Sequence, residues 1–447
     1  MKKVSIIGVG KVGISLCAAL LNSKFSVFIS DKDKNLISKY KKKKFPFYEP
    51  GIKKIIIQNF NKLTFSDDSK ELIKKTDTTF IVVPTNSNNY GGFSNKYILQ
   101  VFDSIKEELI KKEKFHTFAL VSTVVPGSSL LQIIPYIEKI TKKKINKSFG
   151  FCYNPSFIAQ GEILKGITHP VFSIIGYSSK RSLKTIKDIN KSIIINDSKI
   201  LGMSLTEAEI TKLASNTYET MRLSFINMIA QISNEIGDTN VDNITNALTF
   251  RFKKRFFKAA APYGGPCWPR DNIALSSLIN QINLKDSIPN AIGTFNNYHS
   301  EYLRSLLKNL LKNKRLKLGI LGLAYKIGTP LITNSFSIDL IKSILPYTKN
   351  IIGYDPLVNK DIEKIIKSKK FKLSNNIKEI KSCDVIIIVQ PFTNINYKIF
   401  SKKIIIDLWR VVKNKDIIKS TNYINFGNSK NKEISKELSN KIKKIII

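Results

Sequence analysis

The chain has 447 residues, 43% of them hydrophobic and 10% aromatic, so it can build packed cores and is unlike a disordered chain. At about 100–200 residues per domain, this length predicts two to four domains. No stretch approaches the ~18 uninterrupted apolar residues of a membrane span, which argues against an integral membrane protein.

The net charge of +39 comes from 73 basic and 34 acidic residues. One interpretation is a nucleic-acid or anionic-membrane partner. The lysine runs at 41–44 and 142–144 are short, however, and no RNA- or DNA-binding motif accompanies them. We therefore favour a lysine-rich composition spread over the whole chain, with no nucleic-acid and no membrane partner. The positive potential would still attract an anionic nucleotide substrate.

Cysteine and histidine usage predicts neither a metal site nor a disulfide framework. No two of the four cysteines have the CxxC spacing of a zinc site or a redox dithiol. This pattern fits a reducing cytoplasm, where we expect the protein to reside. The three histidines have unrelated sequence contexts, and we expect surface or loop roles for His116, His169 and His299.

In the first ~200 residues, short apolar runs alternate with longer amphipathic stretches, as in a parallel sheet with crossover helices. The predicted strands are 4–7, 26–29, 79–83, 118–121 and 150–153. The first run follows two lysines, as in a secretory signal, but Lys11 and three glycines interrupt it, so we expect a strand, a turn and a helix instead.

A long helix is predicted over 206–235, with Gly237 ending it. Further helix continues to the mid-250s, and a Gly/Pro-rich loop follows at 262–269. The alternating pattern restarts near Lys317, with strands predicted at 318–321, 351–354, 385–389 and 404–407 and a basic linker at 312–317.

The predicted fold is α/β, with two Rossmann-like doubly wound domains joined by a central helical domain that contains the long helix. We place the three domains at 1–203, 204–312 and 313–447.

The first motif follows the first predicted strand and opens a helix: Gly8, Val9, Gly10, Lys11, Val12 and Gly13 form a GxGxxG sequence. Its glycines allow a tight turn, a close approach to a pyrophosphate and close helix–strand packing. Asp31, about 20 residues on, ends the second strand and can bind a ribose 2′-hydroxyl while repelling a 2′-phosphate. The motif predicts NAD as the cofactor; the alternative is a glycine-rich turn without a cofactor.

The second motif is GGPCWPRD at 264–271. Cys17, Cys152 and Cys383 stand in apolar segments, whereas Cys267 stands in this Gly/Pro loop near Arg270 and Asp271. A nearby cation raises the thiolate fraction of a cysteine. We favour a nucleophile over a structural thiol at Cys267.

Lys212 and Asn216 are four residues apart on the predicted long helix and therefore share one face. Helical periodicity alone would favour an ordinary solvated face for these two residues.

The chain resembles the UDP-glucose/GDP-mannose dehydrogenase family along essentially its whole length. The matching segments occur in the family's order and spacing: GVGKVG at 8, FYEPG at 47, STVVPG at 122, NPSFIAQG at 154, TKLASNTY at 211, KAAAPYGGPCWPRD at 258, LGLAYK at 321, GYDP at 353 and DLWR at 407.

This resemblance implies roles for individual residues. Cys267 would be the nucleophile, Lys212 and Asn216 would hold the C6 oxygen and a catalytic water, Asp271 would assist proton transfer, and Thr123 would position water. The implied cofactor contacts beyond the glycine motif and Asp31 are Val83, Pro84, Thr85, Ser122 and Thr123. The implied substrate contacts, beside Lys212 and Asn216, are Phe157, Ile158, Arg251, Lys258, Tyr263, Gly264, Gly265, Tyr325, Lys326 and Arg410.

The resemblance also implies an activity and an assembly. The first and third domains would bind NAD and the nucleotide-sugar, and the protein would be a homodimer built on the long helix, with Arg251 reaching into the partner's site. The sugar C6 hydroxymethyl would become a carboxylate through a thiohemiacetal and a thioester on Cys267. The resulting sugar acid would serve polysaccharide biosynthesis. UDP-glucose is the favoured substrate, followed by a UDP-N-acetylhexosamine or GDP-mannose.

Three departures from the family pattern affect this interpretation. Ser156 and Gln160 stand where relatives carry glutamates, so neither can act as a carboxylate base in thioester hydrolysis. Thr333 and Asn334 replace a frequent Arg-Glu pair, which weakens one expected cofactor contact, and Arg270 stands where many relatives have lysine.

Two other functions remain open. A β-hydroxyacid-type dehydrogenase would share the first domain and the helical middle, but it would explain neither Cys267 in its loop nor the third domain. A basic binding protein that has lost turnover would be supported only by Ser156 and Gln160.

Overall fold

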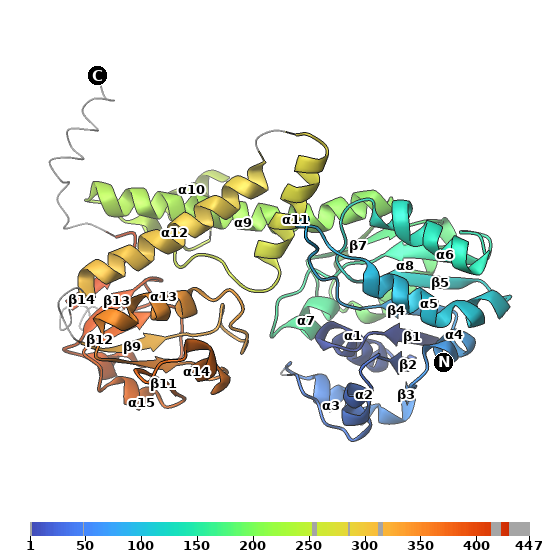
Figure 1. Cartoon of the computed structure of the whole chain (residues 1–447), viewed down its shortest axis with the longest axis horizontal. Coiled ribbons are helices and arrows are strands. Elements are labelled where there is room, and N and C mark those ends of the chain that lie inside the picture. The colour runs from blue at the N-terminus through green and yellow to red at the C-terminus, as the bar shows by residue number, and fades with distance from the viewer. Residues whose placement is uncertain are drawn as a thin grey trace. The chain divides into compact units, whose positions relative to one another are not determined.

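The computed structural model describes residues 2–47, 49–252, 257–284, 287–311, 316–412 and 422–428. The chain divides into two units, which are described separately (Figure 1). Unit 1 comprises Met1–Ser215 and Ser277–Asn283, and unit 2 comprises Asn216–Ser276 and Leu284–Ile447. The division into three domains made from the sequence stays a prediction.

Unit 1 is built on an eight-stranded sheet in the order β3-β2-β1-β4-β5-β6-β7-β8. Neighbouring strands are parallel except β6 and β7, which are antiparallel. The strands are β1 (Lys3–Ile7), β2 (Ser26–Ser30), β3 (Leu63–Phe65), β4 (Thr78–Ile81), β5 (His116–Leu120), β6 (Phe149–Tyr153), β7 (Phe172–Tyr177) and β8 (Lys199–Met203). The five strands predicted from apolar runs are confirmed as β1, β2, β4, β5 and β6.

Helices cover both faces of this sheet, so its central strands are buried on both sides and are largely apolar in sequence (Figure 1). One apolar cluster lies under α1 (Lys11–Asn22), α2 (Lys34–Lys41), α3 (Ile52–Gln58), α7 (Ile163–Thr168) and α8 (Lys180–Ile193). The other lies under α4 (Ser69–Lys75), α5 (Lys96–Lys111), α6 (Ile134–Thr141) and the π-helical turn η2 (Ser129–Ile133). A 3-10 turn, η1 (Phe60–Lys62), precedes β3.

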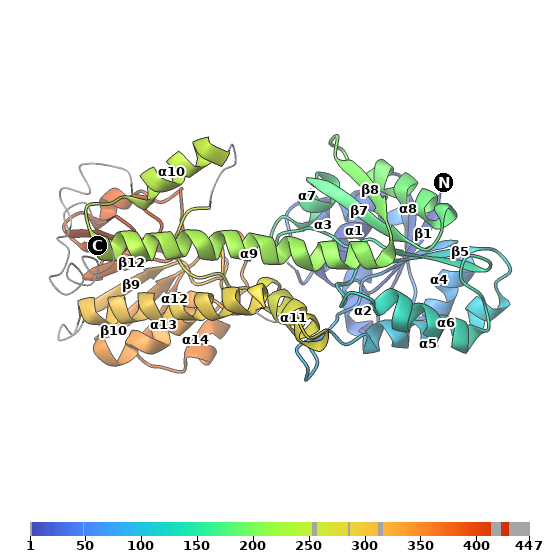
Figure 2. The same ribbon diagram turned by 90° about the horizontal axis from the view of Figure 1, so that it is seen from above.

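The predicted long helix is confirmed as α9 (Leu205–Ile236), and the boundary between the units falls within it (Figure 2). The predicted helix up to the mid-250s is α10 (Val241–Phe252), and α12 (Ile288–Leu311) lies farther along the chain. The loop predicted at 262–269 ends earlier than expected, because α11 (Trp268–Gln281) already includes Pro269. Proline is compatible with the first turn of a helix, which explains this difference.

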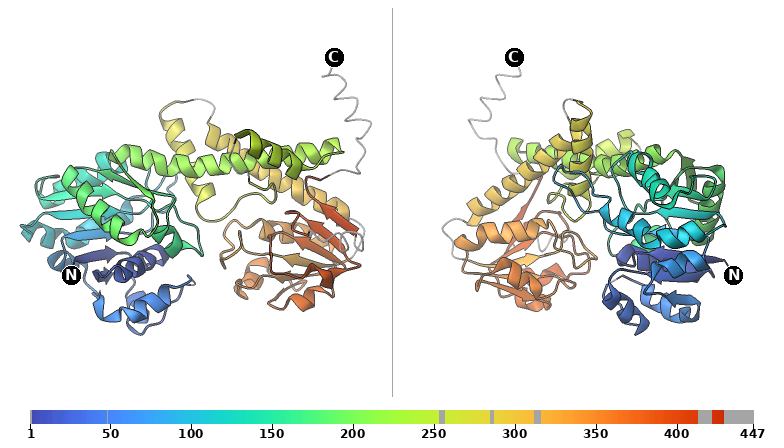
Figure 3. Two further views of the ribbon diagram at one scale, coloured as in Figure 1. Left: turned by 180° about the vertical axis from the view of Figure 1, so that it is seen from behind. Right: turned by 45° about the vertical axis from the view of Figure 1, so that its right-hand side comes forward.

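Unit 2 contains a six-stranded parallel sheet in the order β11-β10-β9-β12-β13-β14. Figure 3 shows the strands of this unit in orange and red from two further sides. Its strands are β9 (Lys317–Leu321), β10 (Asn350–Tyr354), β11 (Phe371–Ser374), β12 (Val385–Ile388), β13 (Ile404–Asp407) and β14 (Asn422–Asn425). The four predicted strands are confirmed as β9, β10, β12 and β13. Lys317 of the predicted linker opens β9, and residues 312–315 lie outside the described residues.

The faces of the second sheet are covered in the same way. The larger apolar cluster involves α12, α13 (Phe336–Ile344) and α14 (Asp361–Ile366), and the smaller one involves α15 (Ile377–Ile380) and the turn η4 (Tyr397–Phe400). Another short turn, η3 (Leu345–Tyr347), follows α13. In each sheet the strand order reverses direction next to the first strand, β1 or β9, and loops at the carboxyl ends of strands there form the usual ligand crevice of doubly wound folds.

Candidate active site

The turn after β1 has the shape that a dinucleotide requires. Gly8 has φ +93°, and a Cβ atom there would overlap the carbonyl oxygen of Val82. A Cβ atom on Gly13 would overlap the carbonyl oxygen of Gly8, whereas one on Gly10 would meet no atom within 4 Å. The outer two glycines are therefore needed for packing within the protein, and the space beside Gly10 fits the approach of a pyrophosphate at the start of α1.

Asp31 holds this turn from the end of β2. Its Oδ2 accepts a hydrogen bond from the backbone N–H of Val9 at 2.7 Å, and its Oδ1 accepts one from Asp33 at 2.9 Å. The buried hydroxyl of Tyr40 donates to the carbonyl of Val9 at 2.9 Å. Burial, followed by the charge of Asp31, raises the pKa of Tyr40, so it remains a donor. The sequence did not point to Tyr40, whose role depends on the fold.

The loops that follow β4 and β5 are joined to each other through predicted cofactor residues. Thr85 Oγ1 donates to the carbonyl of Thr123 at 2.7 Å, and Ser122 Oγ donates to the carbonyl of Val83 at 2.6 Å. Because β4 and β5 are neighbouring parallel strands, these loops leave the same edge of the sheet. The structure thus brings four of the predicted residues together beside the strand-order reversal.

A glutamate on α9 anchors the loop that contains Thr123. Glu209 is fully buried, and its carboxylate accepts hydrogen bonds from the backbone N–H groups of Gly127 at 2.6 Å and Ser129 at 3.0 Å. Burial is the largest influence on this group and raises its pKa. Sequence reasoning missed Glu209, although it lies one helical turn before Lys212 on the segment that carries the predicted pair.

Lys212 lies against the segment in which the family glutamates are replaced. Its side chain is 8% exposed, and its Nζ donates to the backbone carbonyl of Ser156 at 2.9 Å. The same ammonium group lies 4.7 Å from the ring centroid of Phe157, whose ring packs at a tilt of 40° against that of Phe172. The structure therefore groups Lys212 with a predicted substrate residue and with one of the replaced positions.

In unit 2, Cys267 marks the start of α11. Its thiol is exposed, and its carbonyl accepts the hydrogen bond from Asp271 N at 2.8 Å that begins the helix. Asp271 is 1% exposed; its Oδ2 accepts a hydrogen bond from Asn216 Nδ2 at 2.6 Å, and its Oδ1 lies 3.6 Å from Arg270 Nη2. A helix N-terminus and a guanidinium both stabilise a thiolate over a thiol. The predicted residues Cys267, Asn216 and Asp271 thus come together in this unit, while Lys212 and Thr123 belong to unit 1.

The residue after Asp271 connects α11 to α9. The buried Asn272 accepts a hydrogen bond from Thr217 Oγ1 at 2.9 Å and donates to the hydroxyl of Tyr263 at 3.1 Å. Burial raises the pKa of Tyr263. Asn272 was not predicted, because nothing in its sequence context distinguishes it from a surface residue.

The segment 259–263, which leads to Cys267, is fixed by amide side chains and a histidine. Asn227 accepts from Ala260 N at 2.9 Å, and Asn296 exchanges two hydrogen bonds of 3.0 Å with the backbone of Tyr263. His299 Nε2 lies 2.7 Å from the carbonyl of Ala260, and its Nδ1 lies 2.7 Å from Gln231 Nε2. These contacts join the segment 259–263 to the packed helices α9 and α12.

The expectation of surface or loop roles is wrong for two of the histidines. His299 and His116 are fully buried, and His116 lies 2.8 Å from Thr79 Oγ1 within the first sheet. Burial lowers the pKa of His299 to about 4 and that of His116 to about 3. His169 is exposed, as expected. Both buried imidazole rings lie within hydrogen-bonding distance of polar groups inside otherwise apolar packing. The sequence around each histidine gives no sign of these partners.

The two glycines before Cys267 lie against the LGLAYK loop. Gly265 has φ +86°, and a Cβ atom there would lie 2.5 Å from the Tyr325 ring. Gly265 N donates to the carbonyl of Thr333 at 3.1 Å, and Asn334 Nδ2 donates to the carbonyl of Gly265 at 3.1 Å. Thr333 and Asn334, which depart from the family pattern, therefore support the loop that leads to Cys267. Burial, and less strongly the charge of Cys267, raises the pKa of Tyr325.

Three further residues predicted to bind the substrate, Arg251, Lys258 and Arg410, differ in their exposure to solvent. Arg251 and Lys258 are exposed on either side of residues outside the described part of the chain. Asp355, from the GYDP segment, accepts hydrogen bonds from Leu323 N at 3.0 Å and Ala324 N at 3.1 Å, much as Asp31 does in unit 1. The Arg410 side chain is buried in a network within unit 2.

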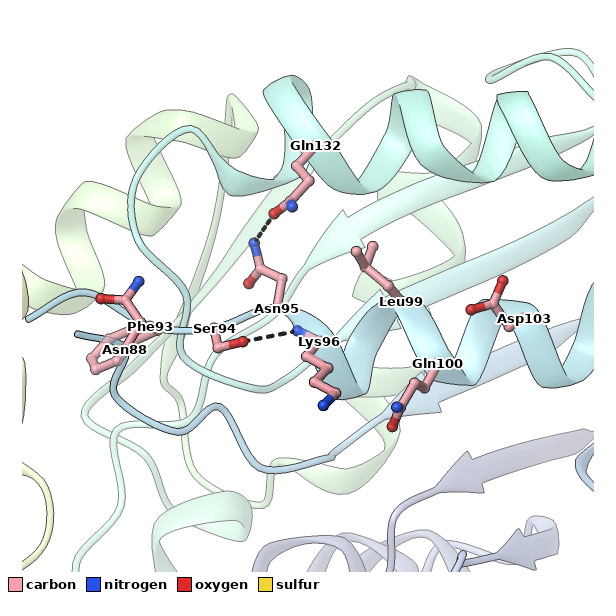
Figure 4. Close-up of a pocket in the computed structure, with 9 residues that line it drawn as sticks. All are labelled: Asn88, Phe93, Ser94, Asn95, Lys96, Leu99, Gln100, Asp103 and Gln132. Carbon is pink, nitrogen blue, oxygen red and sulfur yellow. Dashed lines mark hydrogen bonds between the residues drawn. The ribbon is translucent and has the colours of Figure 1, made fainter. Parts of the chain in front are cut away.

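A cavity of about 470 Å³ opens in unit 1 at the start of α5 (Figure 4). Asn95 and Gln132 point toward each other across it and form a hydrogen bond of 2.8 Å, and Asn88 and Phe93 line another side. None of the residues predicted from the sequence lines this cavity.

Comparison with known proteins agrees with this geometry. The models of three domains of the UDP-glucose/GDP-mannose dehydrogenase family match the chain: the NAD binding domain at residues 2–194, the central domain at 206–298 and the UDP binding domain at 319–414. The chain belongs to this family. It is therefore an NAD-dependent oxidoreductase that acts on a CH–OH group, and its substrate is a nucleotide-sugar.

Individual members of the family are distant from this chain. The UDP-glucose 6-dehydrogenase of Rickettsia bellii is 27% identical over 430 residues, covering 93% of this chain and 96% of the relative. The fold is shared with the UDP-glucose dehydrogenase of Pyrobaculum islandicum, with a TM-score of 0.84, 21% identity and coverage of 96% and 98% of the two chains. It is also shared with the UDP-D-ManNAc dehydrogenase of Pyrococcus horikoshii, with a TM-score of 0.81, 20% identity and coverage of 96% and 100%.

None of the helices in the described ranges has both the length and the apolar character needed to cross a bilayer.

Proposed function

We propose that this family member is a nucleotide-sugar 6-dehydrogenase that converts the C6 hydroxymethyl group of UDP-glucose to a carboxylate. The observation that carries the proposal is the exposed Cys267 thiol at the start of α11, near the buried Asp271 and its hydrogen-bond partner Asn216. A two-electron alcohol dehydrogenase needs no nucleophile, whereas oxidation to an acid must hold the aldehyde.

The chemistry balances with two molecules of cofactor. The glycine turn and Asp31 would hold NAD, which would supply the hydride acceptor for each of the two oxidations. The first oxidation gives an aldehyde, and the Cys267 thiolate adds to its carbonyl carbon to form a thiohemiacetal. The second gives a thioester, and water then releases the acid and the thiol. In total, the alcohol, two NAD+ and one water give the carboxylate, two NADH and three protons.

Lys212 and Asn216 stabilise the oxygen on C6 in this scheme. An ammonium group and an amide N–H both donate to a developing oxyanion, and each such donor typically contributes about 3 kcal/mol. Within its own unit each side chain is held by a hydrogen bond, Lys212 to the Ser156 carbonyl and Asn216 to Asp271. We propose that Thr123 positions the attacking water and that Asp271 accepts its proton, because Ser156 and Gln160 cannot.

UDP-glucose is favoured over the other sugars on two grounds. The Rickettsia bellii relative, aligned over nearly its whole length, is a UDP-glucose 6-dehydrogenase, as is the fold neighbour from Pyrobaculum islandicum by its name. A UDP-N-acetylhexosamine is the main rival, because the Pyrococcus horikoshii neighbour is named for one. GDP-mannose follows.

The surface of α9 supports the proposed homodimer. Between residues 217 and 234, every exposed residue of the helix is apolar: Tyr218, Met221, Phe225, Met228 and Ile232. Their spacing of three or four residues puts them on one stripe of the helix. A stripe of this kind is typical of a helix that packs against another protein surface, and we propose that a second copy of the chain covers it and supplies Arg251.

A panel of nucleotide-sugars tests the proposed function. The purified protein is mixed with NAD and, separately, with UDP-glucose, UDP-N-acetylglucosamine, UDP-N-acetylmannosamine and GDP-mannose, and NADH absorbance is followed. We expect the highest kcat/KM with UDP-glucose. Preference for an acetamido sugar would change the substrate while leaving the reaction intact, and no NADH with any sugar would contradict the activity.

A further inference from the structure

The guanidinium group of Arg410 uses all of its donors inside unit 2. Arg410 lies in the loop that follows β13, has φ +52° and is 7% exposed. Its Nε and Nη2 bind the two carboxylate oxygens of Asp242 at 3.0 and 3.1 Å, and Nη2 also donates to the carbonyl of Ala259 at 2.9 Å. Its Nη1 donates to the carbonyls of Leu408 at 3.2 Å and Phe426 at 2.8 Å.

This arrangement leaves no donor for a ligand. A guanidinium has five N–H groups, and each of the five is directed at one of these acceptors. The bidentate carboxylate of Asp242 also balances the positive charge that would attract a phosphate. A substrate could bind Arg410 directly only by displacing one of these internal bonds.

The groups that accept hydrogen bonds from Arg410 belong to several elements of unit 2, which Arg410 therefore holds together. Leu408 and Phe426 follow β13 and β14, Asp242 lies on α10, and Ala259 begins the segment that leads to Cys267. Downstream of Ala259, the same segment is fixed by Asn227, Asn296 and His299. Arg410 is therefore the contact that ties the beginning of this segment to the second sheet.

We propose that Arg410 is a positioning residue: with Asp242 it fixes the start of the segment 259–265 and thereby the location of Cys267, and it does not contact the nucleotide-sugar. This role rests on the proposed function, in which the segment carries the nucleophile. It departs from the role that the resemblance to the family implies for Arg410, which is direct substrate binding.

The decisive variant is Asp242→Asn, because it keeps the guanidinium and removes the charge that orients it. We expect kcat to fall about 10- to 100-fold, as for small displacements of a reacting group, while the Kd for UDP measured by calorimetry changes little. The rate at which iodoacetamide alkylates Cys267, followed by mass spectrometry, should change together with kcat. Arg410→Lys should behave in the same way, and the double variant should be no worse than the poorer single variant.

Asp339→Asn is the matched control, since Asp339 is exposed on α13 and should leave all three readouts unchanged. The proposal is overturned if Asp242→Asn leaves kcat and alkylation as in the wild type. It is also overturned if Arg410→Lys weakens UDP binding about tenfold or more, the cost of one lost charged hydrogen bond, while Asp242→Asn does not. If Arg410→Lys does not fold, the kcat and the alkylation rate of the Asp242→Asn protein still test the proposal. UDP binding and alkylation need no turnover, so these outcomes are distinct from a failure of the proposed activity.

Discussion

At the scale of single residues, Cys267 differs physically from the other three cysteines. All four are described, and only Cys267 is exposed. Burial raises the pKa of Cys152 to about 12 and that of Cys383 to about 11, and it raises the pKa of Cys17 further. These buried groups are thiols at neutral pH and cannot serve as nucleophiles.

Replacing Cys267 should therefore abolish acid formation. We expect Cys267→Ser to yield no uronic acid. A serine hydroxyl stays protonated at neutral pH unless a neighbouring base activates it, so it is a much weaker nucleophile than a thiolate. Cys17→Ala and Cys383→Ala should retain turnover, apart from a loss of stability from the missing core atoms. The acid is measured by mass spectrometry of the products, and substantial acid from the Cys267→Ser protein would rule out the covalent route.

Ser156 offers a second test at this scale. A general base typically contributes about 10²–10⁴-fold, so without the family glutamates thioester hydrolysis should limit the steady state. Rapid mixing with saturating substrate and NAD should give a burst of NADH followed by a slower rate. Ser156→Glu should raise the slow rate and leave the burst unchanged. Linear NADH formation from the first turnover, with no effect of Ser156→Glu, would show that hydrolysis is not limiting.

The candidate site residues could be proposed from the sequence because each stands in a sequence motif whose chemistry is local. Gly8, Asp31 and Cys267 are recognised from their neighbours in the chain. Glu209 and Asn272 could not be found in this way, since their partners lie about 80 and 55 residues away. Such supporting contacts depend on which segments the fold brings together, and polar side chains in a helical sequence give no sign of it.

At the scale of elements, His299 of α12 joins the segment 259–263 to α9, through contacts with Ala260 and Gln231, and is neutral at pH 7. The folded pKa of His299 is about 4, below the 6.5 of an unperturbed histidine. The stability it contributes is complete above pH 6.5 and falls between pH 6.5 and pH 4, where only the unfolded chain takes up the proton. The shift in the pKa of His299 corresponds to a loss of about 3 kcal/mol in the free energy of unfolding over this pH range.

His299→Gln should reduce this pH dependence, because glutamine can donate to the Ala260 carbonyl without titrating. Urea unfolding at pH 7.5, 6 and 5 measures the effect. We expect the variant to be less stable than the wild type at pH 7.5 but to lose less stability on acidification, the remainder coming from His116. His169→Gln, at an exposed site, is the control and should keep the wild-type profile. Equal losses in wild type and His299→Gln would contradict the assignment.

Most strands with buried, apolar sequences were predictable, although the interior strand β7 (Phe172–Tyr177) was missed despite its buried centre. Strands β1, β5 and β12 are buried along nearly their whole length and appear as apolar runs. The edge strands escaped prediction: β3 has three residues, and β8 is mostly exposed. An edge strand needs fewer apolar residues, because it packs against fewer neighbours, so its sequence resembles a loop.

At the scale of the whole molecule, the apolar stripe on α9 predicts a dimer. Met228→Glu puts a charge in the middle of the stripe, and burying an unpaired carboxylate in an interface is costly. Sedimentation velocity should show a dimer for the wild type and a monomer for Met228→Glu. Ile365→Glu, at an exposed apolar residue of α14, is the control and should stay dimeric. A monomeric wild type would contradict the proposed assembly.

The most direct test of the whole account is the number of NADH molecules formed for each nucleotide-sugar consumed. A limiting amount of UDP-glucose is converted to completion with excess NAD, NADH is quantified by absorbance, and the remaining sugar is measured by chromatography. Oxidation through a thioester on Cys267 requires two NADH for each UDP-glucose, with the acid as the product. A ratio of one, with an aldehyde or ketone as the product, would contradict it.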